Sequence, residues 1–306
     1  MNNSYWSVRQ NNAMTDALNT GNGVASLLLE SYQKALIEIE KELFATIQKY
    51  DLGSNEWYKK MTKSDIASIQ RLYEQMVASG VPQEVASKFR LGIIKANHLE
   101  ALQKQVEAQI IQLHNELHNQ VKEHLKATYQ GTYAEIIKSL GTDIGLANLP
   151  VDAIEEAILY NWSGTNFSNR IWNNSDKMSN AIKDVIVNGI SRGDDVDKMA
   201  KQLAKILDSS FKNALRLIRT ETSFIFNTAA VDAYQKSEMV IGHTFLAYID
   251  SRTSKVCKGL DGEKFLYAKT EPIIGVNTPP MHPYCRSTVV PILKEVDYSG
   301  SNAETE

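Results

Sequence analysis

Residues 250–265 read DSRTSKVCKGLDGEKF, and residues 277–291 read NTPPMHPYCRSTVVP. Five of the seven prolines of the chain lie in its last 35 residues together with Cys285, and the other cysteine, Cys257, lies shortly before them. Proline removes a backbone donor and interrupts helix interiors, so long helices are not expected here. The runs HTFLAYID, EKFLYA and STVVPIL have β character, and Asp261-Gly262 is a hairpin signal between two of them. This part of the chain is therefore predicted to form a small antiparallel sheet.

Upstream of this region the apolar residues follow a helical period. They recur at steps of three or four along residues 32–50 and 99–125, which places them on one face of a helix. We expect the first of these helices to stop at Gly53-Ser54, after the stripe that runs to Tyr50, and a second helix to cover 63–79. A third would begin near Gln83 and run for about 40 residues or more, unless Gly92 or Gly131 bends or ends it.

Further helices are expected in the second half of the chain. One would cover 169–188 and stop at Gly189, and the turn at 193–195 would start another that ends at Leu207. A last helix would run over 210–236.

The predicted fold class is α+β and mostly α. Residues 1–140 would form an elongated helical domain with long antiparallel helices, and residues 141–165 a joint with one short helix. Residues 166–293 would be a helical region that ends in the small antiparallel sheet, and 294–306 a flexible tail. The length of 306 residues suits two domains.

Charge and composition exclude several classes of protein. The net charge is −3, from 33 basic and 36 acidic residues, whereas a dedicated DNA-binding protein should carry a basic stripe. The best local patch is 164–219, with ten Lys or Arg against six Asp. The apolar runs are too short to span a bilayer. The first residues do not resemble a signal peptide, and two cysteines are too few for a disulfide framework. The protein is expected in a reducing cytoplasm, with no need of a membrane.

Cys257, His282 and Cys285 form the candidate chemical site. Thiolates and imidazole are ligands that zinc prefers, and the fourth ligand would be His243, an Asp or water. A second interpretation is a buried apolar cysteine pair, with His282 holding the proline-rich loop by hydrogen bonds. A third is a cysteine nucleophile with His282 as its base, although nothing in the sequence suggests an oxyanion hole.

Other candidate residues are polar or aromatic. His114 and His118 have metal-ligand spacing but no evident third ligand, so a polar face between helices is favoured. A polar cluster is expected to reach into the β region in a structural role. This cluster comprises Arg216, Arg219, Glu221 and Asn227.

Two aromatic groups are candidate partner-binding sites, because interfaces use aromatic and Arg residues as hot spots. Tyr5, Trp6 and Arg9 form either a docking arm or the cap of the helical domain. The second group anchors the joint or binds a partner, and it comprises Trp162, Arg170 and Trp172.

The order of these motifs resembles the phage minor head protein family, also described as head morphogenesis or phage Mu protein F-like proteins. The resemblance covers about residues 1–293. It rests on YWSVR at 5–9, NWSGTNFSNRIW at 161–172, LIRTETSFIFN at 217–227, D-x-R-T-x3-C-x2-LDG-x2-F at 250–265 and PPMHPYCR at 279–286. Family members commonly have two more cysteines, where this chain has Ser254 and Ser287. If the four-cysteine version binds zinc, half of its ligands are absent here.

The resemblance implies a non-enzymatic virion component without a cofactor. It would be a low-copy protein inside the head, associated with the portal oligomer, incorporated during procapsid assembly and involved in genome ejection. Scaffold or coat protein and phage DNA would be further partners, and the host cytoplasm the place of assembly. Two alternatives remain at this stage: a metal- or cysteine-dependent enzyme centred on the Cys/His cluster, and a DNA-binding protein that acts during packaging or ejection.

Overall fold

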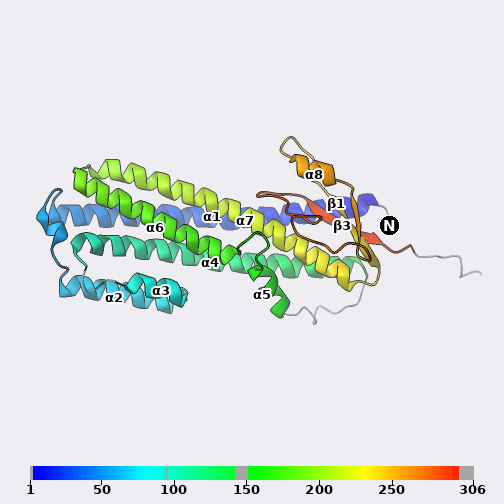
Figure 1. The fold of residues 1–306 in the computed structure, drawn as a ribbon, viewed down its shortest axis with the longest axis horizontal. Coiled ribbons are helices and arrows are strands. Elements are labelled where there is room, and N and C mark those ends of the chain that lie inside the picture. Colours follow the sequence, from blue (N-terminus) through cyan, green and yellow to red (C-terminus); the bar gives the residue numbers. More distant parts are fainter. Residues whose placement is uncertain (1–2, 92, 94–95, 142–150, 296–306) are drawn as a thin grey trace, which may run out of the picture. The chain divides into compact units, whose positions relative to one another are not determined.

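The structure is a computed structural model that describes residues 3–91, 93, 96–141 and 151–295. Helices dominate it, and a three-stranded antiparallel sheet lies near the C-terminal end of the chain (Figure 1). The predicted class, α+β and mostly α, is confirmed. The elements are α1 (Asn3–Tyr50), η1 (Asn55–Tyr58), α2 (Lys63–Ala78), α3 (Gln83–Arg90), α4 (His98–Ser139), α5 (Val151–Leu159), α6 (Phe167–Arg192), α7 (Val196–Lys236), β1 (Val240–Leu246), α8 (Lys255–Leu260), β2 (Lys264–Leu266) and β3 (Thr288–Leu293).

Helix α1 begins well before the periodic stretch from which it was predicted. It ends at Tyr50, just before the stop predicted at Gly53-Ser54, and Asp51 and Gly53 then adopt positive φ, which closes the helix. Gly21 does not interrupt it. A Cβ at this position would lie 3.1 Å from His124 Nε2 and 3.2 Å from Thr222 Oγ1, so glycine allows close packing here.

The long third helix predicted from residue 83 is two helices in the structure. Helix α3 ends at Arg90 and α4 begins at His98. Reciprocal hydrogen bonds start α4: Asn97 Oδ1 accepts from Glu100 N at 2.9 Å, and Glu100 Oε2 accepts from Asn97 N at 2.8 Å. This pair satisfies backbone donors at the new helix start. Gly131 lies inside α4 and does not end it.

Helix α6 continues past Gly189, where the sequence predicted a stop. A side chain at 189 would collide with Met199 of α7, so this glycine serves close helix packing. The actual end is Gly193, which adopts the left-handed conformation (φ 69°) that favours glycine. Helix α7 is also continuous, so the break expected between Leu207 and Ser210 is wrong.

The sheet has the order β2-β1-β3, with both pairs antiparallel. Asp261-Gly262 does not form a two-residue hairpin, because α8 lies between β1 and β2. Instead, the Asp261 carboxylate accepts from Ala247 N at 2.9 Å, and Gly262 N donates to Phe245 O at 2.9 Å. The prediction of paired strands is correct, but that of a tight turn is wrong.

The chain divides into two compact units. Unit 1 comprises residues 1–22, 123–164 and 216–306, and unit 2 comprises 23–122 and 165–215. Both units therefore combine segments far apart in the sequence, whereas the sequence predicted consecutive domains with a boundary at 141–165. Part of that joint (142–150) and most of the predicted tail (296–306) lie outside the described residues. Within the described helices, none combines the length and apolar character that crossing a membrane requires.

Candidate functional site

The structure brings Cys257, His282 and Cys285 together in unit 1. Ser254 caps α8, its hydroxyl accepting from Cys257 N at 3.1 Å, which places Cys257 in the first turn of that helix. Cys285 follows a turn in which its own N–H donates to His282 O at 3.1 Å. Both thiols are buried in a small apolar cluster with Phe245.

The three side chains are close enough to share one ion. Cys257 Sγ lies 3.4 Å from His282 Nε2 and 3.7 Å from Cys285 Sγ. All three ligand atoms lie within 4.8 Å of one another. Among the described residues, this is the one group of three or more His, Cys, Asp or Glu side chains that lie close enough to hold a metal ion. His243, considered as a fourth ligand, lies outside the cluster, where its Nε2 is 3.1 Å from Asn277 O.

The two thiols have unequal acidity. Hydrogen bonds to Cys257, first from Cys285 and then from Ser254 and Ser287, lower the pKa of the Cys257 thiol. The pKa of Cys285 is raised, first by its hydrogen bond to Cys257 and then by burial. The two thiols therefore titrate as a coupled pair, in which Cys257 is the more acidic.

A cavity of about 240 Å³ adjoins this cluster, and Cys285 is one of its lining residues. Three arginines from separate motifs reach it: Arg219 from α7, Arg252 from the loop before α8, and Arg286 from the segment before β3. Only Arg219 was among the sequence candidates. The other two were missed because the quoted motifs lie apart along the chain and only folding brings them together.

Asp250 holds part of this arginine group in place. Arg286 donates to both of its carboxylate oxygens, at 2.7 and 2.8 Å, and Arg252 lies 3.6 Å away. The Arg286 hydrogen bond is the main cause that lowers the pKa of Asp250 to about 2. Arg219 Nε donates to Asn22 Oδ1 at 2.8 Å. The cavity therefore carries more positive than negative charge.

The remaining members of the predicted polar cluster have different surroundings. Asn227 Nδ2 donates to Ser287 O at 3.3 Å, next to β3. Glu221 is buried and accepts from Trp162 Nε1 at 3.2 Å. Arg216 is exposed.

The N-terminal aromatic group is part of a helix and not a free arm. Trp6 is 2% exposed, whereas Tyr5 is exposed. Arg9 pairs with Glu135 at 3.0 Å and also donates to Tyr5 Oη at 3.3 Å. Of the two interpretations, this geometry agrees with a cap on the helices.

The second aromatic group is divided between the units. In unit 1, Trp162 stacks on Phe224 with ring centroids 5.3 Å apart. In unit 2, Trp172 packs partly buried against an apolar core cluster, and Arg170 donates to Thr165 O at 3.3 Å.

The histidines of α4 have separate partners. His114 is fully buried with Nδ1 2.9 Å from Ile110 O, and His118 stacks on Phe167. His124 Nε2 lies 2.8 Å from Thr222 Oγ1. They belong to helix packing and not to a shared metal site.

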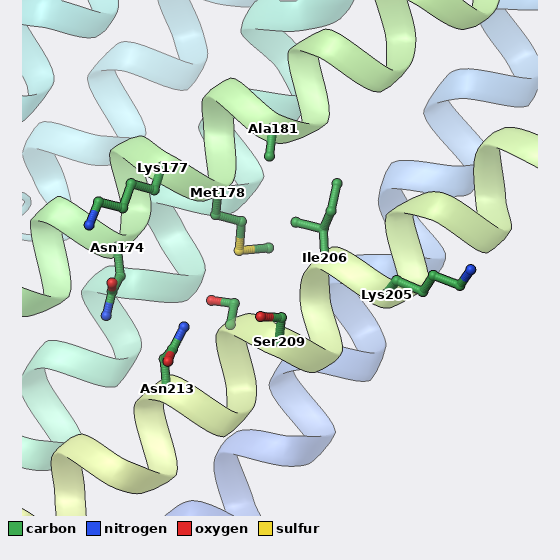
Figure 2. Close-up of a pocket in the computed structure, with 9 residues that line it drawn as sticks. Asn174, Lys177, Met178, Ala181, Lys205, Ile206, Ser209 and Asn213 are labelled. Atoms are coloured by element: carbon green, nitrogen blue, oxygen red, sulfur yellow. The ribbon is translucent and has the colours of Figure 1, made fainter. Parts of the chain in front are cut away.

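A second cavity, of about 320 Å³, lies between α6 and α7 in unit 2. Figure 2 shows Met178 pointing toward Ile206, while Lys177 and Lys205 extend away from the space between the helices. None of its nine lining residues is acidic, histidine or cysteine.

The basic stretch 164–219 is partly neutralised by ion pairs. Lys183 pairs with Glu107, and Lys212 pairs with Asp208.

Comparison with known proteins identifies the region that contains this site. Residues 180–290 match the family described as Phage Mu protein F like protein. This part of the chain, about a third of its length, is similar to that family, and the match supports the class of phage head morphogenesis proteins.

One curated relative is similar over a short stretch. It is the NAD(+)--arginine ADP-ribosyltransferase EFV of Enterococcus faecalis (strain ATCC 700802 / V583), 25% identical over 105 residues. The similarity covers 33% of this chain and 22% of the relative, so the chain spans about a fifth of that protein. No solved structure matches the chain.

Proposed function

We propose that the protein is a low-copy minor head protein that binds the portal oligomer during procapsid assembly and remains inside the head. The match of residues 180–290 to a phage head family carries this proposal. The role is non-enzymatic and needs no cofactor for assembly. Contacts with scaffold or coat protein and exit with the genome belong to the same proposal.

Helix α1 offers an apolar surface for such a partner. Its segment in unit 2 exposes Leu27, Leu29, Ile37 and Phe44 by 40–60%. Ile37 and Phe44 are seven residues apart and therefore lie on the same helix face. Apolar and aromatic side chains of this kind are what interface cores bury.

Point substitutions test this surface better than a deletion. Removing residues 1–50 would delete buried core side chains, among them Trp6, Leu28 and Leu43, so the remaining chain should not fold. Exchange of exposed side chains leaves the core intact.

We expect the double variant Ile37→Ser, Phe44→Ser to fold normally but to enter heads about tenfold less, as measured by its amount in purified particles. The matched control is Gln33→Ser, Gln48→Ser, which alters exposed polar positions of the same helix. Normal incorporation of the apolar double variant would contradict docking through this face.

A second candidate function, DNA binding during packaging or ejection, is favoured by the arginine-lined cavity. Guanidinium groups pair well with phosphates, and the binding should weaken steeply as salt rises. Arg252 is the best probe because it is exposed. Arg252→Gln should weaken binding to a duplex oligonucleotide and reduce its salt dependence, with Lys41→Gln on α1 as the control. Binding that ignores salt, or no binding, would remove this candidate.

A further inference from the structure

We propose that Cys257 Sγ, Cys285 Sγ and His282 Nε2 bind one zinc ion, which ties α8 to the proline-rich loop before β3. This inference rests on the geometry of unit 1 and does not depend on the proposed role in the head.

Two of the distances within the cluster match a tetrahedral zinc site, and all three ligand atoms lie within 4.8 Å of one another. Zinc binds cysteine sulfur at about 2.3 Å and histidine nitrogen at about 2.0–2.1 Å, so two sulfur ligands lie about 3.8 Å apart and sulfur and nitrogen about 3.5 Å. The corresponding distances here are 3.7 Å between the two sulfurs and 3.4 Å between Cys257 Sγ and His282 Nε2. A disulfide would need the sulfurs at about 2.05 Å. The side chains are thus spaced for a common ion.

The imidazole of His282 is held in the tautomer that binds metal. Its Nδ1 lies 2.8 Å from the carbonyl oxygen of Pro283. A carbonyl can only accept, so Nδ1 carries the proton and Nε2 has its lone pair facing Cys257. Metal-binding histidines are commonly oriented by such a second hydrogen bond.

The local chemistry also suits a divalent cation. The two cysteine side chains are free and buried, and as thiolates they would balance the +2 charge of zinc. Binding at neutral pH would release the thiol protons to solvent. Three protein ligands leave one position of the tetrahedron for water. Ser254 and Ser287 are hydrogen-bonded to Cys257, so both hydroxyls lie beside the proposed ion.

The first experiment measures zinc in the full-length protein, kept reduced with a phosphine, after loading with zinc sulfate and gel filtration. We expect about one zinc per chain by elemental analysis, and a rise in melting temperature that a chelator reverses. Cadmium in place of zinc should produce thiolate-to-metal absorption. Reduced, folded protein that retains no zinc would overturn the proposal.

Substitutions then assign the ligands. Cys285→Ser and His282→Gln should each lower zinc affinity about tenfold or more, while His118→Gln, outside the cluster, should not change it. Ser254→Cys and Ser287→Cys provide the opposite test, because each adds a thiolate beside Cys257 and should tighten binding by about tenfold or more. Equal zinc affinity in all these variants would place the metal elsewhere and refute the site, even if one ligand variant failed to fold.

Discussion

Burial decides the chemistry of individual residues in this protein more than their sequence neighbours do. His114 and His118 have the spacing of a metal pair on one helix, yet each contacts a different group. Burial lowers the pKa of His114 to about 4 and also lowers those of His118 and His124. When a group binds protons more tightly in the unfolded chain than in the folded one, the free energy of unfolding falls as the pH is lowered.

His114 provides a prediction with a definite sign. Its folded pKa of about 4 is below the unfolded value of 6.5, so the unfolded state binds more protons between these values. Stability should be constant above about pH 6.5 and fall, by roughly 3 kcal/mol from this residue, as the pH approaches 4. His114→Gln should show a smaller loss in urea unfolding between about pH 7 and about pH 5. An unchanged pH dependence would contradict the assignment.

Gly242 is a second residue whose role is steric. A Cβ there would collide with the backbone of Phe265 and Leu266 in β2. Gly242→Ala should therefore destabilise the protein by about 2 kcal/mol, measured by chemical unfolding. Gly259→Ala in α8 is the matched control, since its added methyl meets no atom within 4 Å. Equal stability of the two variants would count against the close strand contact.

At the scale of elements, the helix ends follow local chemistry while the helix interiors follow packing. Thr62 and Asp65 form a capping box at the start of α2, and Asn166 caps α6. Gly189 and Gly131 lie within helices despite their low propensity. The stop predicted at Gly189 is wrong: glycine costs about 1 kcal/mol inside a helix, but here α6 continues and Met199 occupies the space that a side chain would need.

The capping box of α2 can be tested directly. Thr62 Oγ1 accepts from Asp65 N at 3.2 Å, and the Asp65 carboxylate accepts from Thr62 N at 2.9 Å. Thr62→Ala should cost about 1 kcal/mol in the free energy of unfolding. Thr20→Ala, at an exposed position inside α1, should cost nothing measurable. A loss confined to the control would show that α2 is not held by this cap.

At the scale of the molecule, unit 1 depends on segments from both ends of the chain. His124 of α4 contacts Thr222 of α7, Tyr129 donates to Asp232, and Arg219 donates to Asn22 of α1. A fragment that begins at residue 166 lacks residues 1–22 and 123–164, which belong to this unit.

Residues 166–306 expressed alone should therefore not fold cooperatively, although they include the whole family match at 180–290. Thermal unfolding followed by circular dichroism should show a broad, weak transition for the fragment and a sharp one for the full chain. A sharp transition in the fragment would support the consecutive domains predicted from the sequence.

The sequence by itself determined the class of the fold, several helix boundaries and the segments that carry the chemistry. Helical periodicity, Gly53 and the late prolines are local signals, so they predicted a helix end close to that of α1, the extent of α2 and a small sheet near the end of the chain. The family resemblance came from motifs that are readable without a structure. Only the tertiary structure decided what these motifs form together, because contacts between distant segments depend on how the helices pack. It placed Arg252 and Arg286 on one cavity with Arg219, directed His243 to Asn277, and brought the ligand atoms of Cys257, His282 and Cys285 within 4.8 Å of one another.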